Sequence, residues 1–182
     1  MEPESSQYRR RALVVLGMHR SGTSAVAGTL VKAGATPAVS LMGSALDNVR
    51  GFWEAATLAD LDERILKAAG LRWDSPGLPS GDPGDGTGAT ARSGLAEALA
   101  REYPEGDHWV VKDPRLCRLV PLLEAALQDL GALPVYVIVL RHPYEVAASV
   151  HGRDGTPQDR ALLLWLQHTL AAERDTRGRP RL

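Results

Sequence analysis

Three short runs of apolar residues stand out along the chain and predict strands that are buried on both faces. They cover residues 12–16, 109–111 and 135–140. A strand with one face in water alternates apolar and polar side chains, whereas near-continuous apolarity is typical of a parallel sheet covered by helices. We therefore expect these runs to form the strands of a central parallel sheet.

Between and after these runs, apolar residues recur at three- and four-residue spacing, which predicts amphipathic helices. The expected helices span residues 23–33, 54–69, 92–102, 119–130 and 159–174, and a further helix begins near Pro143. Gly34, Gly70 and Gly131 are placed as helix stops. The alternation of strands and helices predicts an α/β fold, a three-layer sandwich around the parallel sheet.

Length and composition predict one folded domain that spans residues 1–182. A chain of 182 residues falls within the usual size of a single domain, and its 44% hydrophobic and 24% charged residues are typical of globular proteins. Residues 74–90 are dense in glycine, proline, serine and aspartate. Such a composition cannot bury apolar surface, so we expect a flexible loop there.

Charge and cysteine content exclude several classes of function. The 21 basic and 22 acidic residues give a net charge of -1, so no overall basic field attracts nucleic acid, and any anion site must be local. Cys117 is the single cysteine, and the five histidines form no metal-binding spacing, which argues against a disulfide or a metal centre. No apolar segment approaches the ~20 residues that span a bilayer or has the form of an export signal, so a cytoplasmic location is expected.

A glycine-containing loop between the first apolar run and the first helix is a candidate anion site. Its sequence at 17–24, GMHRSGTS, has glycines at the spacing of the P-loop pattern GxxxxGK[ST], but Thr23 replaces the lysine. Backbone N–H groups at such a helix start converge on an anion, and without the lysine a group smaller than a triphosphate is better matched. The candidate ligands are His19, Arg20, Ser21, Gly22, Thr23 and Ser24.

A second candidate anion site follows the third apolar run. Arg141 ends this run, Pro143 is well placed to begin a helix, and Ser149 follows eight positions after the arginine. If the helix begins near Pro143, tertiary folding can bring Arg141 and Ser149 to one anion. The alternative is a surface arginine at a strand end and a small residue on a packed helix face.

These two sites together resemble those of sulfotransferases that use 3′-phosphoadenosine 5′-phosphosulfate (PAPS). The segment RSGTS at 20–24 resembles the family's 5′-phosphosulfate loop, and the arginine, proline and serine spacing is similar to its 3′-phosphate site. KDPR at 112–115 and GFWE at 51–54 resemble a largely bacterial branch. The resemblance implies a P-loop NTPase-like sulfotransferase fold and transfer of a sulfonate group from PAPS, without a metal. It also implies adenosine 3′,5′-bisphosphate as the product and a hydroxyl as the acceptor, on a small molecule or carbohydrate, with lipid and protein tyrosine left open as alternatives.

The resemblance also implies catalytic roles. Arg20 matches the basic residue beside the phosphate–sulfonate bridge, and Lys112 ends a strand in a position to face the sulfonate. Pro114 stands where other members carry a histidine base, so Glu54 is the candidate base and Asp113 the reserve. The alternative for Glu54 is a carboxylate in the first turn of a helix, where the helix dipole favours it.

Asp113 and Arg115 are candidate ligands of the acceptor. Two alternatives stay open, because Asp113 with Pro114 is also a helix-start signal and Arg115 can pair with a carboxylate. The resemblance further implies another strand and helices after residues 178–182, so the domain is expected to be incomplete at its C-terminal side. An unpaired sheet edge there would favour self-association.

Two other functions are compatible with these motifs. A divergent P-loop kinase would depend on magnesium and would need a substitute for the missing lysine. A non-catalytic nucleotide-binding module or fragment would keep the fold and bind the nucleotide without turnover.

Overall fold

The computed structural model describes residues 10–43, 51–77 and 87–182. Strands and helices alternate along most of this part of the chain. In chain order they are β1 (Arg10–Leu16), α1 (Thr23–Lys32), α2 (Ala56–Ala68), α3 (Thr87–Glu102), β2 (His108–Lys112), the 3₁₀ helix η1 (Pro114–Arg118), α4 (Val120–Asp129), β3 (Ala132–Ile138), α5 (Pro143–Asp154) and α6 (Gln158–Asp175).

The three apolar runs form one parallel sheet, which confirms the expectation from the sequence. In the described part of the chain the strand order is β2-β1-β3, and β1 pairs in parallel with both neighbours. Leu13 aligns with Val110 on one side and with Val135 on the other. Val14 and Leu16 of β1 have no accessible surface, as expected for a central strand covered on both faces.

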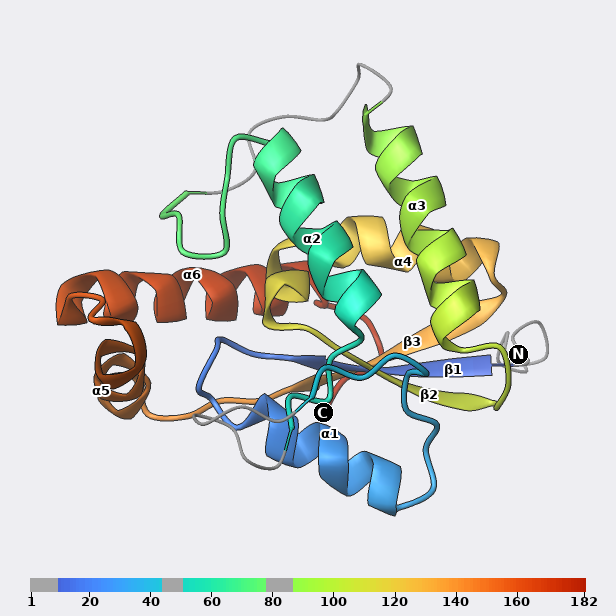
Figure 1. The fold of residues 1–182 in the computed structure, drawn as a ribbon, viewed down its shortest axis with the longest axis horizontal. Coiled ribbons are helices and arrows are strands. Elements are labelled where there is room, and N and C mark those ends of the chain that lie inside the picture. The colour runs from blue at the N-terminus through green and yellow to red at the C-terminus, as the bar shows by residue number, and fades with distance from the viewer. Residues whose placement is uncertain (1–9, 44–50, 78–86) are drawn as a thin grey trace.

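Helices cover both faces of this sheet (Figure 1). α1 lies on one face, and α2, α3, α4 and α6 lie on the other. The architecture is therefore α/β, with a parallel sheet between helices, and it is compatible with a three-layer sandwich. The main apolar core lies mostly on the side of the four helices and includes Leu66, Leu99, Trp109, Leu123 and Leu127.

Short segments pair with both outer strands. Thr36 bonds with β2, since its N–H donates to the carbonyl of His108 (2.7 Å) and its own carbonyl accepts from Val110 (2.9 Å). On the other side, the N–H of Tyr136 donates to Pro180 (2.9 Å) and the N–H of Leu182 donates to Tyr136 (2.9 Å). Residues 180–182 thus run parallel beside β3, where the sequence led us to expect the approach to another strand.

Several boundaries differ from those expected. α3 begins at Thr87, so residues 87–90 of the predicted 74–90 loop are helical, residues 74–77 form a turn and a bend, and residues 78–86 lie outside the described part. α2 begins at Ala56 and its first turn holds no acidic residue. Glu54 therefore lies before the helix, and its alternative interpretation as a first-turn carboxylate is wrong. η1 begins at the helix-start signal of Asp113 and Pro114, which the sequence left open as an alternative.

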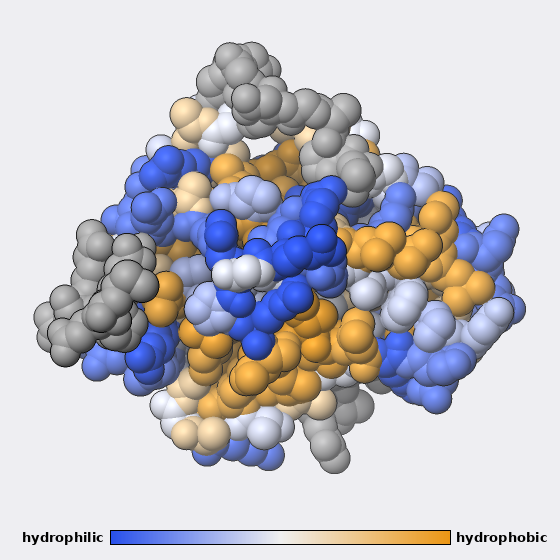
Figure 2. Space-filling view, turned by 180° about the vertical axis from the view of Figure 1, so that it is seen from behind, coloured by the Kyte–Doolittle hydropathy of each residue, from blue (hydrophilic) through white to orange (hydrophobic). Residues whose placement is uncertain are grey.

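α6 exposes leucine side chains along one side. Leu163, Leu166 and Leu170 are each more than 40% exposed, and their spacing of three and four residues places them on one side of the helix. The back of the molecule likewise carries hydrophobic side chains among hydrophilic ones (Figure 2). Within the described residues, every helix is too short or too polar to cross a membrane.

Candidate functional site

A pocket of about 270 Å³ lies at the carboxyl ends of the strands, where the predicted site residues gather. It is lined by the loop after β1, the segment before α2, the end of β2, and α5. The lining residues are His19, Arg20, Gly22, Thr23, Ser24, Ala25, Phe52, Glu54, Lys112, Pro114, Arg141, Ser149 and Arg153. The carboxyl ends of parallel strands are the usual place for ligands in open α/β sheets.

The loop after β1 needs glycine where it begins. Gly17 has φ +152°, and a Cβ built on it would lie 2.7 Å from the carbonyl oxygen of Val139. The N–H of Gly17 donates to the Sγ of Cys117 (3.1 Å), whose thiol has its pKa raised to about 12 by burial. Cys117 therefore supports the loop as an uncharged acceptor. The sequence gave no sign of this role, because the two residues are one hundred positions apart.

The two predicted phosphate sites meet in this pocket. The Nε of Arg20 donates to the hydroxyl of Ser149 (2.9 Å), and the Nη1 of Arg141 donates to the carbonyl of Arg20 (3.2 Å). Arg141 also pairs with Glu145 one turn into α5 (2.8 Å), and the indole of Trp165 donates to its carbonyl (3.1 Å). Both residues of the second predicted site, Arg141 and Ser149, thus contact Arg20 of the loop after β1.

A buried ion pair between Lys112 and Glu54 forms another wall of the pocket. The ammonium of Lys112 contacts the Oε1 of Glu54 and also donates to the carbonyl of Phe52 (3.1 Å) and the hydroxyl of Ser24 (3.3 Å). Burial raises the pKa of Glu54, whereas the positive charge of Lys112 opposes that shift. The structure therefore brings together the candidate base and the lysine expected to face the sulfonate.

The remaining residues of the loop have different surroundings. Thr23 is buried at the start of α1, and the hydroxyl of Ser24 donates to the carbonyl of Phe52 (3.1 Å). Ser21 does not line the pocket, and its buried hydroxyl has no partner among the described residues. His19 lines the pocket with its ring edge against Trp73, at 4.6 Å between centroids. Burial is the main reason that the pKa of His19 lies well below its ordinary value of 6.5.

Asp113 and Arg115, the predicted acceptor ligands, do not line the pocket. Asp113 is buried and caps η1, since its Oδ1 accepts from the N–H of Arg115 (2.8 Å). Arg115 pairs with the carboxylates of Asp113 and Glu63, both at 2.9 Å. The structure thus gives both residues the structural roles that the sequence left open as alternatives. Of the two candidate bases, it places Glu54 in the pocket.

Sequence reasoning did not include Arg153, which lines the same pocket. It follows Ser149 by four positions on α5, so both residues lie on the same face of the helix. That spacing was a signal that could have identified it. The guanidinium of Arg153 lies over the ring of Trp73, 5.1 Å from the centroid. Trp73 therefore borders the pocket region through Arg153 and His19.

The charges of the lining residues suit an anionic ligand. The lining contains one carboxylate, that of Glu54, and four positively charged side chains, those of Arg20, Lys112, Arg141 and Arg153. Within the described ranges, no three histidine, cysteine, aspartate or glutamate side chains are grouped to hold a metal ion. Comparison with protein-family models, curated proteins and solved structures gave no match to the chain. We therefore infer function from the geometry and charge of the pocket.

Proposed function

We propose that this protein is a sulfotransferase that moves a sulfonate group from PAPS to a hydroxyl of a small-molecule or carbohydrate acceptor. The observation that carries the proposal is the contact of Arg20 with Ser149 and Arg141 in one pocket. Arg20 and Ser149 are 129 positions apart in the sequence, so folding alone brings the two sites together. A ligand with two separate phosphate groups matches such a pair of sites.

The donor groups of the pocket fit a doubly phosphorylated adenosine. Arg141 and the hydroxyl of Ser149 would hold the 3′-phosphate. Arg20 and the backbone at the start of α1 would hold the 5′-phosphate, because a helix N-terminus and a guanidinium both favour an anion. The absence of the P-loop lysine at Thr23 supports a bisphosphate over a nucleoside triphosphate.

The reaction needs a base, a positive charge for the leaving group and a dry site. PAPS supplies the sulfonate group and carries the phosphate that leaves. Glu54 accepts the proton of the acceptor hydroxyl as its oxygen bonds to sulfur. Arg20 stabilises the negative charge on the bridging oxygen, which keeps the electron pair of the broken sulfur–oxygen bond. Lys112 holds Glu54 in place and favours its ionised form.

Calorimetric titration with adenosine 3′,5′-bisphosphate, against ADP with Mg²⁺, tests the proposal. We expect the bisphosphate to bind at least about tenfold more tightly, a difference of about 1.4 kcal/mol. Tighter binding of ADP would overturn the proposal and favour a kinase. Incubation with ³⁵S-labelled PAPS and a panel of hydroxyl acceptors then tests turnover, and bisphosphate binding without any transfer would favour a non-catalytic module.

A matched pair of variants tests the 3′-phosphate site. Arg141→Ala is expected to weaken binding of adenosine 3′,5′-bisphosphate at least about tenfold while changing the affinity for adenosine 5′-monophosphate less. Arg177→Ala is the control, because Arg177 also pairs with a glutamate four positions away, Glu173, but lies outside the pocket. Equal losses for the two nucleotides in Arg141→Ala would count against a 3′-phosphate contact.

A further inference from the structure

Arg153 lines the pocket but belongs to neither of the two predicted phosphate sites. Arg20 contacts both Ser149 and Arg141, whereas Arg153 contacts Trp73 and Asp154. Arg153 shares the lining of the pocket with Lys112 and Glu54, where an acceptor hydroxyl would lose its proton.

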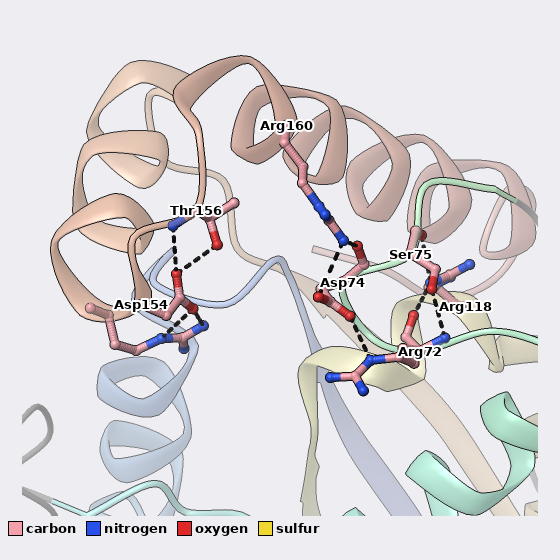
Figure 3. Close-up of polar contacts among 8 residues, drawn as sticks. Arg72, Asp74, Ser75, Arg118, Asp154, Thr156 and Arg160 are labelled. Atoms are coloured by element: carbon pink, nitrogen blue, oxygen red, sulfur yellow. Dashed lines mark hydrogen bonds and ion pairs between the residues drawn. The ribbon is translucent and has the colours of Figure 1, made fainter.

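Trp73 is a fixed platform for this arginine. The segment that carries it is anchored on both sides, as Figure 3 shows for Arg72, Asp74 and Ser75. Arg118 donates to the carbonyls of Arg72 (2.8 Å) and Ser75 (3.2 Å), and Arg160 on α6 donates to the carbonyl of Asp74 (2.8 Å). These bonds fix the backbone beside Trp73, whose indole contacts the His19 ring and the Arg153 guanidinium.

The guanidinium of Arg153 keeps hydrogen-bonding capacity beyond its partner in the chain. Its Nε and Nη2 both donate to the Oδ2 of Asp154, at 3.1 and 2.7 Å, out of five N–H donors that a guanidinium carries. Asp154 also accepts from the N–H and hydroxyl of Thr156, at 3.2 and 2.6 Å. Asp154 thus has other donors if Arg153 turns to a ligand, which lowers the cost of that exchange.

We propose that Arg153, stacked on Trp73, is a specificity-determining residue that selects hydroxyl acceptors carrying a carboxylate. A guanidinium binds a planar carboxylate through two parallel N–H bonds, and the contact of Arg153 with the indole of Trp73 orients its guanidinium. The inference rests on the proposed function, because it places the acceptor hydroxyl at Glu54. The proposed substrates are therefore phenols that carry a carboxylate and sugar acids.

Two nearly isosteric probes, 4-hydroxyphenylacetate and 4-hydroxyphenylacetamide, test the charge preference. Each is titrated by calorimetry into the protein saturated with adenosine 3′,5′-bisphosphate. We expect the acid to bind at least about tenfold more tightly than the amide, and Arg153→Gln to reduce the ratio below about threefold. Arg174→Gln is the matched control, since Arg174 pairs with the adjacent Asp175 through the same kind of contact but does not line the pocket.

Each outcome of these titrations is decisive. Equal binding of the two probes, no binding of the acid, or a preference that survives in Arg153→Gln would overturn the proposal. So would a large loss of bisphosphate affinity in Arg153→Gln, which would make Arg153 a nucleotide contact. If the wild-type protein does not bind the bisphosphate, the proposed function fails by itself. The same two probes, titrated without nucleotide, then show whether Arg153 still selects the acid.

Discussion

Glu54 is a buried carboxyl on which two neighbouring effects act in opposite directions. Burial raises its pKa above the ordinary value of 4.5, and the ammonium of Lys112 lowers it. The net direction is upward, so the group is a stronger base than an exposed glutamate. As a general base it must be ionised, so turnover should rise with pH through this raised pKa.

We predict that Glu54→Gln lowers kcat by about 10²- to 10⁴-fold and changes the Kd for adenosine 3′,5′-bisphosphate less than about threefold. Glutamine keeps the size of the side chain but cannot accept the proton. The measurement is the rate of ³⁵S-sulfonate transfer between pH 5 and 9, with Glu63→Gln as a control outside the pocket. If Glu54→Gln leaves kcat unchanged, or keeps the fall in rate that the wild type shows at low pH, Glu54 is not the base.

Asp62 on α2 is a fully buried carboxyl, and neither of its oxygens has a partner among the described residues. Burial raises its pKa well above 3.8, and the negative charges of Asp113 and Glu54 add to the shift. Its folded form therefore holds a proton that the unfolded chain has released. The contribution of Asp62 to stability must accordingly fall as pH rises from about 4 through its folded pKa.

Asp62→Asn should remove this loss, because the amide has nearly the same shape and does not ionise. We expect the variant to gain stability over the wild type as pH rises, by about 1–3 kcal/mol at pH 9. Urea unfolding at pH 5, 7 and 9 measures the difference. Asp129→Asn is the control, because Arg92 lowers the pKa of Asp129 at the surface, so this carboxyl is ionised in the folded and the unfolded chain and its replacement should have a constant effect over this pH range. A constant difference for Asp62→Asn across this pH range would contradict the prediction.

At the scale of elements, apolar runs predicted the strands well because each is buried on both faces. The first residues of some elements were harder to predict, because tertiary packing there overrides the preference of single residues. The predicted apolar run starts at Val135, yet β3 begins at Ala132 and includes Pro134, because a strand at the side of a sheet tolerates proline. α3 begins at Thr87 and includes Gly88, a residue that disfavours helices on its own.

The candidate site was predictable where its residues lie just after strands. Arg20, Lys112 and Arg141 follow or end β1, β2 and β3, and the carboxyl ends of parallel strands meet at one edge. Contacts that depend on long loops were not predictable. Trp73 meets Arg153 through anchoring bonds to Arg118 and Arg160, and no spacing in the sequence encodes those bonds.

Gly17→Ala tests the closeness of the β1 loop to the end of the third strand. The added methyl would meet the Val139 carbonyl at 2.7 Å and the Thr23 methyl at 2.9 Å, so the backbone must move. We expect a loss of about 1–3 kcal/mol in unfolding free energy and weaker bisphosphate binding. Gly152→Ala is the control in α5, where nothing lies within 4 Å, and it should be neutral or stabilising. Equal stability of the two variants would show that the loop has room for a side chain.

At the scale of the whole molecule, buried histidines and buried carboxyls make stability depend on pH in opposite directions. His168 on α6 is buried, and burial lowers its pKa from 6.5 to about 4. Its Nδ1 lies 2.8 Å from the carbonyl of Leu164, so the neutral ring donates there. Below pH 6.5 the imidazole of His168 binds a proton in the unfolded chain but stays neutral in the folded chain until the pH approaches 4. This contribution is therefore complete above pH 6.5 and is lost as pH falls toward 4.

The shift of His168 corresponds to roughly 3 kcal/mol between the two limits, which is a large part of the stability of an ordinary domain. We predict that the wild-type protein loses stability steeply between pH 6.5 and 4, and that His168→Leu loses clearly less over the same range because leucine gains no proton. Urea unfolding at half-unit pH steps measures both slopes. The apolar replacement suits a site beside Leu164 and Ala172, which are themselves fully buried. Identical slopes in the two proteins would mean that His168 is protonated in the folded state, and the acid loss would then have to come from other buried groups such as His19.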